Sequence, residues 1–544
     1  MHCKSCLLLF ALLLCAGLAA QPLSGNYSIP GNYKTFTAAA AALQSNGVSG
    51  PVTFVVVPGT YTESFSLPPV QGASSTNTIT FRSIIPGKVQ LKGASGDTVT
   101  FATGTSNQPT AWYVLEGIEF TSGPGYAIKR NKYCHDIEIK ECIFRAAHGS
   151  SSTTPRLWYV DSKNFASRWK VHHNEFAMPA NGYGLYLSQI SYWEFHHNTV
   201  DLNGCRRGMF FINNNRAYNR IYNNLFFGTL AGGSSNAALH VAASNYENEI
   251  THNTFLVKTT SGNAIFTQGW NSGINHILSN IIMVIGGGNC LRVYRASGSA
   301  ANLARHEADN NIYWAPGGTV GYWDRGYGTL KAWLASGAAG YNQVTGGEKS
   351  SLQTDPRLVK ATAPFDLRIR PGSPAKDAAT RTPTYVKGDF AGNLRDATPD
   401  LGAYELSAFK LFGTACAGSG NVAPEIGYSG TAAIGGTNFA VTLGKALGGA
   451  GAIMALGTSS QSWGAITLPF PLGGGCDLNV RITLPFPATA GGTGAGNGTA
   501  SQALPIPNDP ALAGGSFYMQ WLVLDPQAPS NYGVVVTRGA SLTL

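Results

Sequence analysis

The chain has 544 residues, of which 12% are charged and 11% are aromatic, and it contains 67 glycines. Disordered chains are rich in charge and poor in aromatic residues, so this composition excludes general disorder and favours a β protein with many turns. The formal net charge of +9 favours an acidic partner, with ordinary surface charge as the alternative explanation.

The first 20 residues have the composition of a secretory signal peptide. Lys4 supplies the basic start, an apolar run extends from Leu7 to Leu14, and small residues precede Gln21. We therefore expect residues 1–20 to be removed and the protein to be secreted or held at the cell surface. Because no later stretch reaches the roughly 18 apolar residues of a transmembrane helix, we expect no membrane span. For an exported protein, an anionic polysaccharide is a better acidic partner than nucleic acid.

The next elements are a short helix and the first strands. Residues 36–50, FTAAAAALQSNGVSG, predict the helix. Residues 52–68, VTFVVVPGTYTESFSLP, predict two strands that are joined by a Pro-Gly turn.

A repeated phrase runs from residue 113 to residue 313. Successive copies read YVLEGIEF, IEIKECIF, KVHHNEF, EFHHNTV, RIYNNLFF, EITHNTF, HILSNIIM and EADNNIY. We align them on eight anchor residues, at intervals of 25, 32, 24, 26, 29, 27 and 31 residues: Gly117, Cys142, Asn174, Asn198, Asn224, Asn253, Asn280 and Asn311. A period in the twenties predicts a solenoid in which each repeat packs only against its neighbours.

The composition of each copy indicates a β-solenoid. Apolar and polar residues alternate around the anchors, and Gly, Asn and Ser fill the spacers, which is typical of short strands and turns. Six of the eight anchors are asparagine, which tolerates a left-handed backbone and hydrogen-bonds to neighbouring main chain. Stacked at about 4.8 Å per coil, these residues are predicted to form an internal asparagine ladder.

Two adjacent histidine pairs stand beside the anchors, in VHHNEF and FHHNTV. The pairs occupy columns that hold polar residues in other copies, so we expect His172 to stack on His196 and His173 to stack on His197. A zinc or copper site needs three or four ligands, and no carboxylate or cysteine completes a set here, so we predict no metal site. Four cysteines of the repeat region are predicted to be small core residues: Cys134, Cys142, Cys205 and Cys290.

A second recurrent strand lies between the anchors, in AIKRN, WYVDS, GLYLS, GMFFI, ALHVA, AIFTQ and CLRVY. Alternation along a strand places one column inward: Ile128, Trp158, Leu185, Met209, Leu239, Ile265 and Leu291. The next column then faces outward: Lys129, Tyr159, Tyr186, Phe210, His240, Phe266 and Arg292. Two positions further on, the same face is expected to include Asp161 and Tyr294.

The outward column is the predicted substrate-binding surface. We expect its aromatic faces to contact sugar rings and its cations to bind carboxylated or sulfated units of an acidic polysaccharide or a cell-surface glycan. Packing of the aromatic residues under long loops or against the C-terminal domain is the alternative.

The end of the chain predicts a separate domain. Residues 412–544 are rich in Gly, Ala, Thr and Pro, and strand-like pieces such as FAVTLG, LNVRITLPF and FYMQWLVLD suggest a small β-sandwich. Cys416 and Cys476 are its cysteines, and in an exported domain they are candidates for a disulfide whose pairing the sequence leaves open.

Over residues 25–406 the chain resembles the right-handed parallel β-helix proteins, the superfamily of pectate lyases and polygalacturonases. The resemblance implies that the helix at 36–50 is an N-terminal cap. The segment GDFAGNLRDATPDLGAYEL is similar to the closing segment of secreted bacterial β-helix proteins and implies that the solenoid ends near Glu405. The expected fold class is all-β, with a signal peptide at 1–20, a right-handed parallel β-helix at 21–406 and a C-terminal β-sandwich at 412–544. The last domain is similar to modules of planctomycete secreted proteins, which implies surface attachment or accessory binding.

β-Helix enzymes usually bind an extended polysaccharide along one outward-facing sheet. If the surface of this chain is catalytic, β-elimination on a uronic acid is the chemistry that best matches its basic charge. That reaction needs a base, a cation beside the carboxylate and an acid for the leaving oxygen. We assign the base to Lys129 or His240 and the cation to Arg292 or Arg130, and Tyr159 or Tyr186 would be the acid.

Three functions remain open at this point. The paired aspartates of polygalacturonases, a pectate-lyase arginine motif and an acidic calcium cluster are missing from the sequence, so calcium is unsupported and we expect no cofactor. The first hypothesis is a monomeric protein that binds and cleaves an acidic polysaccharide. The alternatives are a surface or adhesive β-helix without catalysis and a glycoside hydrolase, although the carboxylate pair that hydrolysis requires is not evident.

Overall fold

The computed structural model of the protein describes residues 21–146, 155–160, 168–212, 218–242, 247–268, 274–294, 305–322, 326–335, 347–406, 408–430, 432, 434–512 and 514–544. The predicted signal peptide at 1–20 lies outside the described residues. The chain divides into two compact units. The first extends to Val386 and includes Pro399–Tyr404, and the second contains Lys387–Thr398 and Glu405–Leu544.

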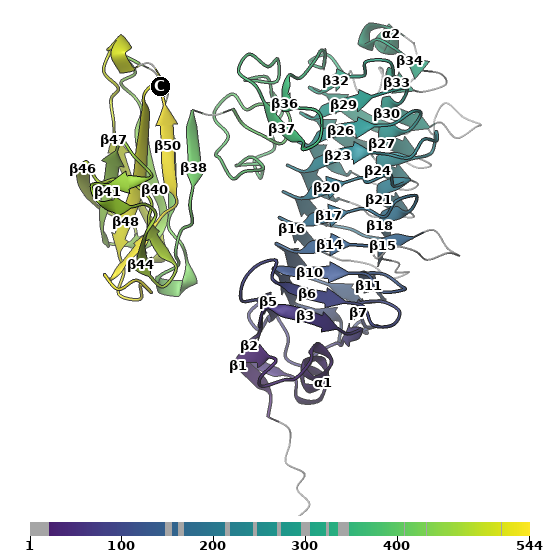
Figure 1. Cartoon of the computed structure of the whole chain (residues 1–544), viewed down its shortest axis with the longest axis horizontal. Helices are drawn as coiled ribbons and strands as arrows, with labels where there is room; N and C mark the ends of the chain where they lie inside the picture. The colour runs from purple at the N-terminus through teal and green to yellow at the C-terminus, as the bar shows by residue number, and fades with distance from the viewer. Residues whose placement is uncertain are drawn as a thin grey trace, which may run out of the picture. The chain divides into compact units, whose positions relative to one another are not determined.

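The first unit is a solenoid built from three long sheets (Figure 1). Sheet A contains β1 (Leu23–Ile29), β2 (Val48–Val56), β5 (Ile79–Ser83), β9 (Tyr113–Glu116), β13 (Glu138–Lys140), β16 (Lys170–His172), β19 (Glu194–His196), β22 (Arg220–Tyr222), β25 (Glu249–Thr251), β28 (Ile274–Leu278) and β31 (Arg305–Asp309). Sheet B contains β3 (Gly59–Thr62), β6 (Val89–Lys92), β10 (Ile118–Thr121), β14 (Ile143–Arg145), β17 (Glu175–Ala177), β20 (Thr199–Asp201), β23 (Leu225–Thr229), β26 (Thr254–Lys258), β29 (Ile281–Ile285), β32 (Ile312–Trp314) and β35 (Leu352–Gln353). Sheet C contains β4 (Phe65–Leu67), β7 (Val99–Phe101), β11 (Ile128–Arg130), β15 (Arg156–Val160), β18 (Tyr183–Ser188), β21 (Arg207–Ile212), β24 (Ala237–Ala242), β27 (Asn263–Gln268), β30 (Asn289–Tyr294), β33 (Thr319–Tyr322) and β34 (Gly326–Tyr327).

From β2 to β33, each coil of the solenoid contributes one strand to each of these sheets, in the order A, B, C. Strands pair in parallel with those of the adjacent coils, as in the pairs β16–β19 and β18–β21. The β33–β34 pair at the end of sheet C is antiparallel. The predicted all-β parallel β-helix is therefore confirmed.

A short helix lies at the N-terminal end of the solenoid, as predicted (Figure 1). In α1 (Phe36–Asn46) the hydroxyl of Thr35 accepts a hydrogen bond from the Ala38 N–H at 3.0 Å, which satisfies one N–H group of the first turn. The Phe36 ring stacks on Phe81 of the first coils, with 5.9 Å between ring centres. The helix thereby covers the open end of the core.

A second helix, α2 (Leu330–Ala335), lies at the opposite end and was not predicted (Figure 1). Its Trp333 contacts the ring of Tyr327 at 5.6 Å and fills the space where Gly321 has no side chain.

Among the described residues, no helix is long and apolar enough to cross a membrane.

The predicted asparagine ladder lies at the turn between sheets A and B. Within it, the side-chain oxygen of Asn224 accepts hydrogen bonds from the N–H of Asn198 at 2.9 Å and from its Nδ2 at 3.1 Å. The same pattern, with every member buried, links the whole series: Cys142, Asn174, Asn198, Asn224, Asn253, Asn280 and Asn311. The residue before each ladder position has a left-handed φ, and His173 and His197 are two of these residues, at 56° and 54°.

The expected anchor Gly117 is wrong by one position. Register pairs Glu119 with Ile143, which places Ile118 beside Cys142. Gly117 instead occupies the left-handed turn position, with a φ of 70°. The glycine matches the geometry of the turn, and the buried isoleucine after it fills the place that asparagine takes in later coils.

A second, shorter ladder lies where the chain enters sheet A. Asn219 Nδ2 donates to the side-chain oxygen of Asn248 at 2.9 Å, and Asn248 Nδ2 donates to that of Asn275 at 2.8 Å. Asn219 also accepts the N–H of Trp193 at 2.9 Å. The two ladders satisfy buried turn groups on both sides of sheet A.

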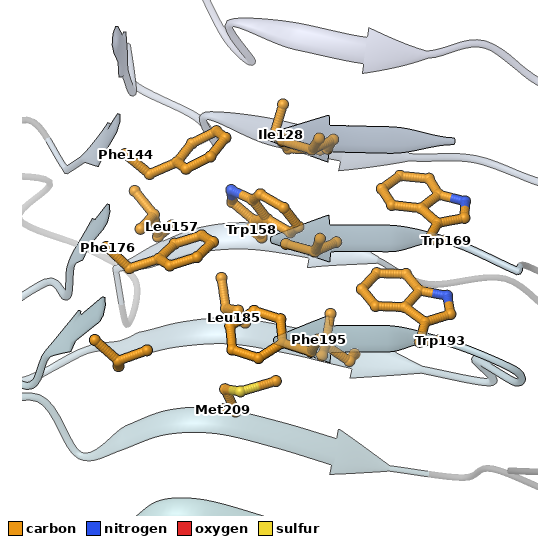
Figure 2. Packing of buried hydrophobic residues seen from close by; sticks show 14 of the residues in the cluster. Ile128, Phe144, Leu157, Trp158, Trp169, Phe176, Leu185, Trp193, Phe195 and Met209 are labelled. Carbon is orange, nitrogen blue, oxygen red and sulfur yellow. The ribbon is translucent and has the colours of Figure 1, made fainter. Parts of the chain in front are cut away.

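Stacked aromatic rings fill the core between the ladders (Figure 2). Phe144 and Phe176 stack at 5.1 Å, and Trp158 packs edge-on to both. Trp169 and Trp193 stack at 4.9 Å with only 5° between their planes. The predicted inward column is buried, as expected: Ile128, Trp158, Leu185, Met209, Leu239, Ile265 and Leu291. The four predicted core cysteines are also buried.

The second unit is built from antiparallel sheets, of which two have more than two strands, and this agrees with the expected all-β C-terminal domain. The larger contains β38 (Phe409–Phe412), β50 (Gly539–Thr543), β48 (Ser516–Leu524), β41 (Gly451–Gly457) and β46 (Leu484–Thr489), and β49 (Val534–Val536) pairs with β48. The smaller contains β39 (Glu425–Ser429), β40 (Ala440–Gly448) and β47 (Gly494–Ala503). Trp521, Met454 and Val441 are fully buried in its core.

Cys416 and Cys476 form a disulfide in this unit, across 60 residues of chain. Replacing both with alanine is expected to lower the free energy of unfolding of the second unit by about 2 to 4 kcal/mol, because a disulfide restricts the unfolded chain. Urea unfolding of the wild type with and without reductant, compared with the double variant, measures this. Reductant should destabilise only the wild type. An equal response in the variant would contradict the assignment.

Candidate functional site

The predicted outward column lies on the outer surface of sheet C, with one residue in each coil. Strand register pairs every member with the next: Lys129, Tyr159, Tyr186, Phe210, His240, Phe266 and Arg292. Tyr322 of β33 continues the column. Because neighbouring strands are about 4.8 Å apart, Lys129 and Arg292 are separated by roughly 29 Å. These two predicted catalytic residues therefore do not share one sugar-binding position.

The rings of this column stack on one another. Tyr159 stacks on Tyr126 at 5.0 Å and on Tyr186 at 5.3 Å, with interplanar angles of 17° and 16°. His240 stacks on Phe266 at 4.3 Å. Tyr159 therefore has a ring packed on each of its faces and offers neither face to a sugar. Phe210 instead lies edge-on to Tyr186, with 74° between their planes.

Two arginines that the sequence analysis missed lie over this column. Arg156 and Arg207 are at the starts of β15 and β21, and register places Tyr183 between them. The Arg156 guanidinium lies 4.3 Å from the centre of the Tyr186 ring, and that of Arg207 lies 4.0 Å from the centre of the Phe210 ring. Aligning RLWYV, YGLYLS and RGMFFI at their first residues would have found them.

The predicted cation Arg292 also lies over rings of the column. Its guanidinium is 4.9 Å from the centre of Phe266 and 4.8 Å from that of Tyr322, and it donates to the carbonyl of Ser234. The Nε of Arg207 donates to the neighbouring carbonyl of Ser235 at 3.4 Å. The middle of the column is consequently buried, and Phe210 and Phe266 are 5% and 3% exposed.

His240 lies between two of these cations. It is only 2% exposed. Burial, followed by repulsion from Arg207 and Arg292, lowers the pKa of His240 to about 3, against the opposing effect of a hydrogen bond with Gln268. The imidazole is therefore neutral in neutral solution and able to accept a proton.

The remaining predicted site residues lie apart from this group. Lys129 forms an ion pair with Asp97 at 3.0 Å. Arg130, the alternative cation of the predicted reaction, is 1% exposed and lies inside the solenoid, where its guanidinium is 6.0 Å from the centre of the Trp169 ring. Its assignment to the outer surface was wrong, because alternation along β11 turns it inward.

Two predicted members of the second outward row cannot be placed. Asp161 lies outside the described residues. Tyr294 belongs to β30, and its side chain also lies outside the described part of the chain.

The histidine pairs stack between coils, as predicted. His172 lies parallel to His196 at 4.9 Å, and His173 lies parallel to His197 at 4.8 Å. Within each pair the two Nδ1 atoms are 2.9 Å and 2.7 Å apart. Burial lowers the pKa of His173 to about 4, with smaller contributions from His172 and Lys140. Among the described residues, no group of three or more His, Cys, Asp or Glu side chains is arranged to hold a metal ion.

No protein-family model matches the chain, and no curated protein matches it. Solved structures with similar coiled architecture do match. A mannuronic acid specific polysaccharide family 6 lyase from human gut microbiota is 15% identical, with a TM-score of 0.30 over 61% of this chain and 91% of that one. A PL6 family alginate lyase is 13% identical, with a TM-score of 0.33 over 73% of this chain and 60% of that one. A pectate lyase is 14% identical, with a TM-score of 0.31 over 71% of this chain and 98% of that one. Similarity at these identities and TM-scores gives no information about the activity of this protein.

Proposed function

We propose that the outer surface of sheet C binds an acidic polysaccharide through the guanidinium groups of Arg156, Arg207 and Arg292. The main observation behind the proposal is that two of these arginines have no carboxylate nearby in the described part of the chain. Among the described residues, no carboxylate lies within ion-pair distance of Arg156 or Arg207, whereas Lys129 of the same sheet forms an ion pair with Asp97. Carboxylate or sulfate groups of a polymer would place negative charge beside these guanidinium groups.

The spacing of the three arginines suits a linear polymer that runs along the solenoid. Arg156 and Arg207 are two coils apart, and Arg207 and Arg292 are three coils apart. At about 4.8 Å per coil, the strands that carry them are roughly 10 Å and 14 Å apart. The half-buried tyrosines Tyr159, Tyr183 and Tyr186 lie beside Arg156 and add hydroxyl groups to the same surface.

The guanidinium groups are also held in place before any ligand binds. Arg156 contacts three tyrosine rings at 4.3 to 5.8 Å, and Arg207 contacts Tyr183 and Phe210 at 5.0 and 4.0 Å. A planar cation that is packed on aromatic rings loses less conformational entropy when it binds a carboxylate than a free surface lysine does. The aromatic rings of the outward column therefore hold the arginine side chains in position.

Cleavage by β-elimination is the second candidate function, and the grouping of Arg207, His240 and Arg292 favours it. The reaction needs a base and a cation near one uronic acid, and a neutral imidazole between two guanidinium groups supplies both. The burial of His240 opposes this role, because the arginines must turn away before a polymer reaches the ring. The pKa of about 3 also makes the imidazole a weak base. Binding without cleavage is therefore the better-supported function.

The test compares two pairs of variants. The double variant Arg156→Ala, Arg207→Ala is expected to bind pectate, alginate or a sulfated glycan at least tenfold more weakly than the wild type, and with a shallower salt dependence, because two charge-assisted contacts are lost. Arg82→Ala with Arg370→Ala removes the same charge from exposed positions outside sheet C and should change affinity little. If both double variants lost the same affinity, the effect would depend on net charge alone, and the proposal would be rejected.

The same preparations test cleavage. Ultraviolet absorbance from unsaturated sugar ends would rise in the wild type and stay flat in His240→Gln if elimination occurs. A flat trace in the wild type with retained binding leaves a binding protein.

A further inference from the structure

A cavity of about 300 Å³ opens on the outer side of sheet A, away from the strands that carry the arginine column. Its lining comes from four adjacent coils: Tyr192, Trp193 and Glu194, then Tyr218 and Arg220, then Glu247 and Glu249, and finally His276. Small-ligand sites begin at about this volume, and they combine apolar surface with a few fixed polar groups. This cavity has both.

Two exposed tyrosines form the apolar side of the cavity. Tyr192 and Tyr218 occupy the same turn position in adjacent coils, are 51% and 42% exposed, and stack at 5.3 Å with 14° between their planes. Both have a left-handed φ, at 56° and 46°, which is strained for a bulky side chain. The next coils have Arg168 and Glu247 at this position. The aromatic pair is therefore confined to the coils that border the cavity.

A buried indole contributes a hydrogen-bond donor. Trp193 is 1% exposed and stacks on Trp169, and Figure 2 shows the nitrogens of both indoles on the side away from the centre of the core. Nε1 of Trp193 has no acceptor among the described residues. A buried N–H without a partner costs free energy, and a ligand oxygen would recover it.

The polar side of the cavity is a fixed row of charged groups. Arg220 contacts Glu194 at 3.4 Å and Glu249 at 3.3 Å, so one guanidinium joins three coils. The hydroxyl of Tyr385 donates to Glu249 at 2.7 Å, and the Arg220 guanidinium lies 4.3 Å from the centre of the Tyr385 ring. These contacts orient the carboxylate and guanidinium groups for hydrogen bonds with a ligand.

The charge of the cavity differs from that of the arginine column. Three carboxylates, of Glu194, Glu247 and Glu249, face one guanidinium. The remaining lining residue, His276, hydrogen-bonds with Glu307 at 2.6 Å. An acidic sugar would be repelled here, whereas hydroxyl groups can donate to the carboxylates and accept from the guanidinium and the indole.

We propose that this cavity is a second saccharide site that takes an uncharged hexopyranose unit. The apolar face of the sugar packs against the tyrosine pair at Tyr218, and its hydroxyls contact Arg220, Glu249 and the indole of Trp193. This site does not depend on the arginine column for any contact. If both sites are occupied, the protein distinguishes the neutral units of a glycan from the acidic ones by binding them to different sheets.

The test measures binding of neutral gluco-, galacto- and manno-oligosaccharides by calorimetry, beside an oligouronate and a glucosamine oligomer. At least one neutral series is expected to bind, and Tyr218→Ala should weaken it at least tenfold, whereas Tyr218→Phe, which keeps the ring, should retain most of the affinity. Tyr532→Ala, which removes an exposed tyrosine of the second unit, is the matched control and should change nothing. Oligouronate binding should be unaffected by Tyr218→Ala.

Three outcomes would overturn the proposal. These are no binding of any neutral series, the same neutral-sugar affinity in Tyr218→Ala as in the wild type, or stronger binding of the glucosamine oligomer than of every neutral one. Circular dichroism and thermal unfolding of each variant separate loss of the site from loss of the fold. The double variant Arg156→Ala, Arg207→Ala should bind the neutral sugar normally, so a failure of the acidic site and a failure of this site are distinguishable.

Discussion

Replacing Asn224 with alanine is expected to lower the free energy of unfolding of the solenoid by about 4 kcal/mol. The side chain accepts two hydrogen bonds from Asn198, and its Nδ2 donates to the carbonyls of Phe195 and Tyr222 and to the side chain of Asn253, at 2.8 to 3.1 Å. It is fully buried. Alanine leaves these donors and acceptors without partners, and each buried group left unsatisfied costs roughly 1 to 3 kcal/mol.

Urea unfolding followed by circular dichroism measures the effect. Asn107→Ala, at an exposed position, is the control for loss of an asparagine side chain and should change the free energy of unfolding by less than about 0.5 kcal/mol. Because a solenoid is stabilised through its nearest neighbours, hydrogen exchange should increase first in the coils on either side of Asn224. A loss as small as that of the control would show that the ladder contributes little to stability.

The ladder was predictable because its hydrogen bonds depend on the residue type at one position in each copy of the repeat. Asparagine recurs where a left-handed residue precedes a buried turn, and six anchors were found from identity and spacing alone. The second ladder carries an equally local signal, since Asn219, Asn248 and Asn275 each stand five residues before an anchor. It was missed because the alignment followed the histidine pairs and did not extend toward the start of each copy.

The outward column was predictable in position but not in geometry. Alternation along a strand fixes which side chains leave the sheet, and the register confirms every predicted neighbour. It does not fix how rings orient, so the stacking of Tyr159 on Tyr186 was unexpected. Stacking along the coils follows from their short spacing, since flat rings that are one coil apart can contact face to face.

The cavity on sheet A depends on contacts that no local pattern contains. Tyr385 hydrogen-bonds Glu249 across 136 residues of chain, and Glu307 pairs with Arg381. The segment that follows the last coils packs back over sheet A, and the sequence offered no periodicity there. Tyr192 and Tyr218 were visible in the sequence, but their exposure follows from the turn geometry.

Acid is expected to destabilise the solenoid, with His240 as a main cause. Its folded pKa of about 3 lies below the ordinary histidine value of 6.5. Between these two values the unfolded chain binds more protons than the folded one, so stability is complete above about pH 6.5 and falls as the pH drops toward 3. His173, with a pKa of about 4, and His196, whose pKa is also lowered, act in the same direction.

Comparison with His240→Phe isolates this residue, since the other histidines contribute equally to both proteins. The phenyl ring fits the stack between Phe210 and Phe266, where the imidazole lies 4.8 Å and 4.3 Å from its neighbours. Between pH 7 and pH 4 the wild type should lose about 3 kcal/mol more unfolding free energy than the variant, because each unit of pKa difference is worth about 1.4 kcal/mol. Urea midpoints at several pH values measure the difference. Parallel curves for the two proteins would mean that the pKa of His240 in the folded protein stays near its ordinary value of 6.5, and the expected lowering by burial would then be wrong.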